Sequence, residues 1–161
     1  MLSPTSSRPD VPAAYGIVPE NEGRGLLDWS WADERLRGRY IWWLASTRPD
    51  GRPHLMPIWA VWVGEGVAFS TGSSSRKAQN LAQNPFVTIV PERGVESVIV
   101  EGEVVALPEE LLSTFVDAYQ ETYEMDPTAM GEPVFMVKPA KVFGFIDEND
   151  GFPLSATRWA F

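Results

Sequence analysis

Apolar runs that alternate with turn signals divide most of this chain into short strands. Residues 40–46 are aromatic and β-branched, and the sequence Arg48-Pro49-Asp50-Gly51 after them is typical of a tight turn. We therefore expect a hairpin whose returning strand covers residues 54–63. Both alternating sets of side chains in the returning strand are apolar, so we expect it to be buried on both sides.

Four further strands are predicted downstream, over residues 67–71, 86–90, 98–106 and 135–146. Pro139 falls inside the last of them and predicts an edge, a bend or a bulge there. Short helices are expected over residues 30–37, 74–83 and 108–123, the first with Ser30 and Asp33 at capping-box spacing. Six strands joined by short turns predict a mainly β fold, a six-stranded antiparallel barrel with short helices.

The N-terminal segment has a different composition from the rest of the chain. Residues 1–25 contain four prolines among serines and glycines, which disfavours regular helix or sheet. We expect an extended arm that is disordered or wraps a partner subunit, followed by one barrel domain over residues 26–161. The arm contains no apolar stretch of signal-peptide length, so we expect a soluble protein of the cytoplasm with no membrane partner.

Composition excludes several kinds of chemistry. The 161 residues contain no cysteine and one histidine, which rules out disulfides, cysteine nucleophiles and a multi-histidine metal site within one chain. We expect no metal. Because 22 Asp and Glu residues outweigh 13 Lys and Arg, giving a formal net charge of −9, the surface disfavours nucleic acid as a partner.

One polar cluster reverses this negative charge locally. The sequence from Ser70 to Leu81 places several hydroxyls, a glycine and the adjacent cations Arg76 and Lys77 where a strand runs into a helix. Unpaired N–H groups and cations at such a place favour a small anion, a phosphate or a carboxylate. The alternative is that the two cations form a solvated helix face and that Ser75 is only an N-cap.

The order of these motifs resembles the split β-barrel flavin and deazaflavin oxidoreductases related to pyridoxamine 5′-phosphate oxidase. The resemblance covers residues 31–161. It rests on the turn at 48–51, on Pro57-Ile58-Trp59, on Ser75-Arg76-Lys77-Ala78-Gln79-Asn80-Leu81 and on the Glu-Gly strand at 98–104. The ending Thr157-Arg158-Trp159-Ala160-Phe161 is similar to that of the branch that uses coenzyme F420, although Ala160 stands where that branch often has a second basic residue.

The resemblance implies a fold of the FMN-binding split-barrel type, a homodimer, and a cofactor site at the interface between its subunits. It implies that the site binds F420, with FMN as the alternative, through eleven residues: Pro57, Ile58, Trp59, Ser70, Thr71, Ser75, Arg76, Lys77, Asn80, Arg158 and Trp159. The hydroxyls and the two cations would hold the phosphate, and residues 57–59 would border the ring. Asn80 would brace the phosphate loop, either by capping a nearby turn or by direct contact.

These expectations define an oxidoreductase that transfers a hydride to a small unsaturated organic substrate. The alternative is a non-catalytic carrier or storage protein for a flavin, haem or tetrapyrrole. No catalytic side chain is assigned, because hydride transfer at such a ring needs positioning and exclusion of water rather than a nucleophile. His54 is interpreted as a solvated turn residue, Glu101 and Glu103 as a solvent face, and most of the seven tryptophans as core or dimer contacts.

Overall fold

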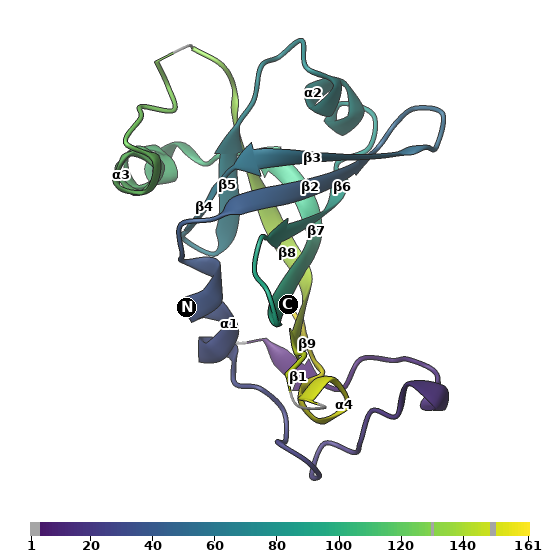
Figure 1. Cartoon of the computed structure of the whole chain (residues 1–161). Coiled ribbons are helices and arrows are strands. Elements are labelled where there is room, and N and C mark those ends of the chain that lie inside the picture. The colour runs from purple at the N-terminus through teal and green to yellow at the C-terminus, as the bar shows by residue number, and fades with distance from the viewer. Residues whose placement is uncertain (1–3, 130, 149–150) are drawn as a thin grey trace.

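The computed structural model describes residues 4–129, 131–148 and 151–161, and its strands there form one antiparallel sheet (Figure 1). Within these ranges there are nine strands: β1 (Thr5–Ser7), β2 (Ile41–Thr47), β3 (Pro53–Trp59), β4 (Val61–Val63), β5 (Gly66–Ser70), β6 (Phe86–Pro91), β7 (Glu96–Ala106), β8 (Val134–Ile146) and β9 (Thr157–Ala160). The predicted mainly β, antiparallel class is confirmed. The predicted number of six strands is too low, because β1, β4 and β9 have only three or four residues each.

Short helices flank the sheet, as expected. They are η1 (Ala13–Tyr15), α1 (Trp29–Leu36), α2 (Arg76–Leu81), η2 (Glu109–Leu111), α3 (Leu112–Tyr123) and α4 (Gly151–Ser155). The capping box predicted at Ser30 is wrong: α1 begins one residue earlier, with Asp28 as N-cap, and Asp33 instead pairs with Arg37 at 2.8 Å.

The long strand β8 splits the sheet. Its first part pairs with β5 and its second part with β9, while β7 runs beside both parts. The pairing register shifts where Pro139 and Ala140 lie opposite the step from Glu101 to Gly102. Pro139 has no N–H to donate, so the predicted bulge is confirmed. The backbones of β7 and β8 approach closely at this point. Gly102 allows this approach, because a Cβ at that position would collide with the carbonyl of Lys138.

The predicted hairpin forms, but its returning strand is not buried on both sides. The expected single strand is two strands, β3 and β4, separated at Ala60. In the described part of the chain β3 pairs only with β2, so it is an edge strand, and Leu55 on it is 58% exposed. An apolar pattern on both faces cannot distinguish a buried strand from an edge strand that presents apolar side chains to a partner.

The N-terminal arm contains regular structure that the prolines did not lead us to expect. Strand β1 pairs with β9, so these two strands lie side by side below the main part of the sheet in Figure 1. Arg8 fastens the arm by donating to the carbonyl of Ala156 at 2.8 Å and to that of Leu154 at 3.4 Å. The arm therefore wraps the C-terminal segment of its own chain.

The core lies on the face of the sheet opposite the exposed side chains of β2 and β3. Trp42, Leu44 and Ile89 are fully buried there, and α1 contributes Ala32 and Leu36. A second cluster forms where α3 packs on β4 through Phe115 and Tyr119. Burial of these apolar side chains stabilises the barrel. The barrel in turn supports the loop before α2.

Candidate functional site

The loop that joins β5 to α2 contains the predicted hydroxyls. Ser75 is the N-cap of α2, because its Oγ accepts from the backbone N–H of Ala78 at 3.1 Å. Its Oγ also lies 3.2 Å from Oγ1 of Thr71, which closes the loop on itself. Ser70 points the other way and donates to the carbonyl of Pro133. The N-cap interpretation of Ser75 is therefore confirmed, and Thr71 is held beside it.

A carboxylate already lies at this loop. Oε2 of Glu132 accepts from the backbone N–H of Ser73 at 2.8 Å. An acidic side chain on a loop N–H satisfies one backbone donor in the way that a bound anion would. An incoming phosphate would compete with Glu132 for this donor.

Three cations and the single histidine gather at the tip of the β2–β3 hairpin and the start of α2. Arg76 is exposed, and Lys77 and Arg48 are half-buried. Burial lowers the pKa of His54 first, and the positive charges of Arg48, Lys77 and Arg76 lower it further. These four side chains therefore share one electrostatic environment, which is positive in a protein of net charge −9.

Sequence reasoning placed Arg76 and Lys77 in this environment but missed Arg48 and His54. His54 was expected in a solvated turn, whereas it is half-buried within β3 and lies opposite Ser46 of β2. The signal that points to it is the hairpin itself. Once the turn at residues 48–51 is accepted, antiparallel pairing brings residue 54 opposite residue 46 and toward α2.

Asn80 braces α2 rather than facing solvent. Its side chain is 0% exposed, and its Nδ2 donates to Oγ of Ser46 at 3.0 Å. Its Oδ1 has no hydrogen-bond partner among the described residues. The amide thus ties the helix that carries Arg76 and Lys77 to strand β2.

Residues 57–59, which are predicted to border the cofactor ring, lie at the end of β3 that is away from the hairpin turn. Pro57 and Trp59 are exposed on the outer face of the sheet, opposite Trp43 and Ile41 of β2, while Ile58 turns into the core. The ring of Trp59 is stacked on that of Tyr123, with centroids 5.1 Å apart and planes 7° apart. Trp59 is therefore a rigid aromatic surface that remains 40% exposed.

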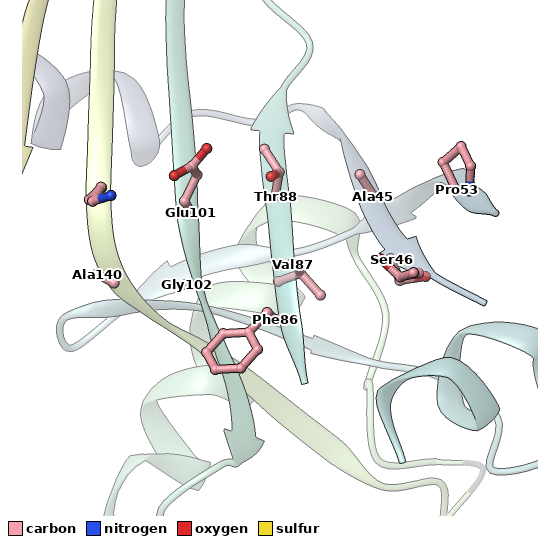
Figure 2. A pocket seen from close by; sticks show the side chains of 11 residues that line it. Ala45, Ser46, Pro53, Phe86, Val87, Thr88, Glu101, Gly102 and Ala140 are labelled. Carbon is pink, nitrogen blue, oxygen red and sulfur yellow. The ribbon is translucent and has the colours of Figure 1, made fainter. Parts of the chain in front are cut away.

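The sheet is hollowed at the other end of β2 and β3, near the hairpin turn, and residues 57–59 do not line this hollow (Figure 2). A cavity of about 390 Å³ lies over β2, β6, β7 and β8, and Phe86, Thr88 and Glu101 line it together with Ser46 at its hairpin end. Glu101 lies opposite Lys141 in the strand pairing, so the two charges face each other across the strands. The floor of the cavity is apolar and its far wall is charged.

Arg158 and Trp159, the two site residues predicted from the C-terminal motif, are not brought to the hydroxyl loop within this chain. Trp159 is 0% exposed and packs edge-on against Trp29 at 5.6 Å, so its ring is part of the core of this chain and its contact with a cofactor stays a prediction. Arg158 lies on the opposite side of β9, half-buried, and donates to Oγ of Ser7 at 3.2 Å.

Two other kinds of site find no support within the described residues. Their His, Asp and Glu side chains do not form any group of three that would hold a metal ion. Among these same residues, no helix has both the length and the apolar character needed to cross a membrane.

Comparison with known proteins agrees with this geometry. The fold is that of a split β-barrel, and the sequence profile described as pyridoxamine 5′-phosphate oxidase matches residues 31–145. The chain therefore belongs to the pyridoxamine 5′-phosphate oxidase family. A search of curated proteins found no match.

Solved structures share the fold at low sequence identity. An F420 reductase is 23% identical with a TM-score of 0.58, over 68% of this chain and 94% of its own. A conserved hypothetical protein from Mycobacterium tuberculosis is 20% identical with a TM-score of 0.64, over 81% of this chain and 91% of its own. The heme storage protein from Vibrio cholerae is 18% identical with a TM-score of 0.57, over 68% of this chain and 88% of its own.

Proposed function

We propose that this protein is an oxidoreductase that binds F420, or FMN in its place, and reduces a small unsaturated organic substrate. The observation that carries the proposal is the cluster of Arg48, Arg76 and Lys77 beside an outer sheet face with exposed aromatic side chains. A phosphorylated ring cofactor needs a cationic site for its phosphate and an apolar surface for its ring. The likeness in fold to an F420 reductase supports the same proposal.

The cationic cluster and the predicted border of the ring lie at opposite ends of β3. From His54 to Ile58 is four residues of strand, or about 13 Å at about 3.3 Å per residue. We therefore assign Arg76 and Lys77 to the phosphate, with Ser70, Thr71 and Ser75 as the hydroxyls beside it and Asn80 as the brace.

The ring would lie along residues 57–59. Pro57 and Trp59 offer an exposed surface, and the backbone of Ile58 runs between them. When bound, the ring supplies the hydride. The side chains of β3 and of the cavity in Figure 2 orient the substrate and exclude water, and no side chain is required to act as a nucleophile.

A second copy of the chain would complete this site. Five large apolar side chains are exposed on the outer face of β2, β3 and β6, namely Ile41, Trp43, Leu55, Trp59 and Phe86. An apolar patch of this kind is typical of an interface in a homodimer. Arg158 faces outward from β9, and we propose that it approaches the cofactor site across this interface.

Titration of the purified protein tests the proposal. Its absorbance spectrum shows whether a flavin is retained, and fluorescence titration with F420 and with FMN measures the affinity for each. We expect micromolar or tighter binding of one of them, and oxidation of the bound reduced form by an unsaturated substrate. Failure to bind either cofactor would contradict the proposal.

The second candidate is a carrier that binds a flavin, haem or tetrapyrrole without turnover. It is favoured by the likeness in fold to a heme storage protein and by the one imidazole, His54, which is half-buried next to the exposed face of β3. Tight binding without substrate-dependent oxidation would support it. A haem complex whose absorbance spectrum changes in the His54→Ala variant would identify that side chain as its ligand.

A further inference from the structure

The backbone pairing of β2 and β3 fixes where His54 points. Ser46 and His54 are directly opposite in the antiparallel ladder, so their side chains lie on the same face of the sheet. Ser46 faces inward and accepts the hydrogen bond from Asn80 of α2. The imidazole of His54 is therefore on the α2 side of the hairpin, whereas the next residue, Leu55, faces outward.

The charged groups that lower the pKa of this imidazole are all cations, and the one carboxylate of the hairpin turn, Asp50, is paired with Arg52 at 2.7 Å. The groups that act on it are Arg48 from the hairpin turn and Arg76 and Lys77 from α2. Its Nδ1 is buried and has no hydrogen-bond partner among the described residues. Burial, followed by these three cations, holds the pKa of His54 below its usual value of 6.5, so the side chain is neutral at pH 7.

We propose that His54 is an additional binding residue for the phosphate group of the cofactor, and that it takes up one proton from solvent when that anion binds. This inference rests on the proposed function, which identifies the anion as the phosphate of the cofactor. A phosphate ester placed among Arg48, Arg76 and Lys77 adds negative charge next to the three cations that act on His54. The protonated imidazole then gains an anionic partner. The negative charge of the phosphate also offsets the three positive charges that disfavour protonation of His54.

The consequence is a site whose affinity depends on pH. A bound anion raises the pKa of His54 above its value in the free protein, so the anion binds more tightly as pH falls through the range between the two values. By linkage, each unit of difference between the bound and free pKa strengthens binding about tenfold between the high-pH and low-pH limits. If His54 stays neutral when the anion binds, the affinity for the anion will not depend on the protonation of His54.

His54 is the one histidine of the sequence, which makes the test direct. Its imidazole gives a single Cε1–H resonance in a proton NMR spectrum, and the pH dependence of that resonance reports its pKa. We would record this titration for the free protein, with sulfate at constant ionic strength, with FMN and with F420. Sulfate stays a dianion throughout the neutral range, so any proton taken up when it binds belongs to the protein.

We expect a saturating anion to raise the pKa of His54 by about one unit or more. The Arg76→Ala/Lys77→Ala variant should show a higher pKa than the wild type in the free state and no response to sulfate. The Arg24→Ala/Lys138→Ala variant removes the same charge at exposed positions on the arm and on β8, and its titration should match that of the wild type.

The outcomes separate this inference from the proposed function. Binding of FMN or F420 with the His54 resonance unchanged would overturn the inference and leave the function intact. A sulfate-dependent rise in the pKa without binding of either cofactor would support the inference and contradict the function. The His54→Gln variant provides the second readout, because its affinity for sulfate, which does not itself titrate in this range, should lose the dependence on pH between about 5.5 and 8 that the wild type shows.

Discussion

Nδ2 of Asn80 and Oγ of Ser46 are joined by a hydrogen bond of 3.0 Å between two buried side chains. This contact links the helix that carries Arg76 and Lys77 to the strand that lies opposite His54. Two elements of the proposed anion site, α2 and β2, are thus joined by one polar contact. Because the contact is buried, its loss would leave unsatisfied polar groups inside the protein.

Substitution Asn80→Ala should therefore act on both stability and binding. We expect a loss of about 1 to 3 kcal/mol in the free energy of unfolding, measured by urea denaturation, because the Ser46 hydroxyl loses its partner. Cofactor affinity should fall as well, since α2 is no longer held against β2. Gln79→Ala, an exposed change on the same helix, serves as the control. An Asn80→Ala variant with wild-type stability would contradict the bracing role.

Arg8 should hold the arm on the C-terminal segment. Its guanidinium donates to the carbonyls of Ala156 and Leu154, so Arg8→Ala removes contacts between the two ends of the chain. We expect faster amide hydrogen exchange in β9 and in the arm, with little change in β6 and β7. Arg24→Ala, in the same arm, should leave exchange in β9 unchanged, and equal effects of the two variants would exclude a specific role for Arg8.

The exposed face of β2 and β3 should be an interface between two copies of the chain. Placing a charge at its centre, in Trp43→Glu, should convert a dimer into a monomer, because an unpaired carboxylate at an apolar interface has no compensating partner. Light scattering after size-exclusion chromatography gives the mass directly. Val95→Glu changes an apolar residue that is also exposed, in the β6–β7 turn, and should leave the dimer intact. A wild-type protein that elutes as a monomer would refute the interface.

Glu96 should make stability depend on pH. Its hydrogen bond to Arg35 at 2.6 Å is the main cause of its lowered pKa, and Arg93 contributes a second at 2.7 Å. A carboxyl with a lowered pKa stabilises the folded state above its unfolded pKa of about 4.5, and this stabilisation disappears as pH falls through the folded value. Glu96→Gln should therefore cost about 1 to 2 kcal/mol at pH 7 and much less at pH 3. Urea denaturation at both values measures this difference, and a cost that is the same at both would contradict it.

Much of the fold follows from local sequence signals. The turn at residues 48–51 fixes the β2–β3 hairpin, Pro139 marks the bulge in β8, and Ser75 caps α2. These features depend on backbone preferences of individual residues, which a sequence displays directly. The class of fold could be predicted for the same reason, and the anion site stays a prediction.

Contacts between distant segments could not be predicted in this way. The pairing of β1 with β9 involves three residues on each strand, and the prolines around β1 hide its pattern. Trp59 and Trp159 look alike in the sequence, yet one is a surface aromatic on an edge strand and the other is a core residue. The difference depends on which strands lie at the edge of the sheet, and that is a property of the whole topology.

The central claim is that Arg76 and Lys77 bind the phosphate of a ring cofactor. The most direct test is the dissociation constant for F420 and for FMN of the Arg76→Ala/Lys77→Ala variant, compared with wild type and with Arg24→Ala/Lys138→Ala. Two charge-assisted contacts of about 1.5 to 3 kcal/mol each predict a loss of about 3 kcal/mol or more, which is a dissociation constant at least about 100-fold higher. An unchanged constant in a variant that remains folded would show that the anion binds elsewhere.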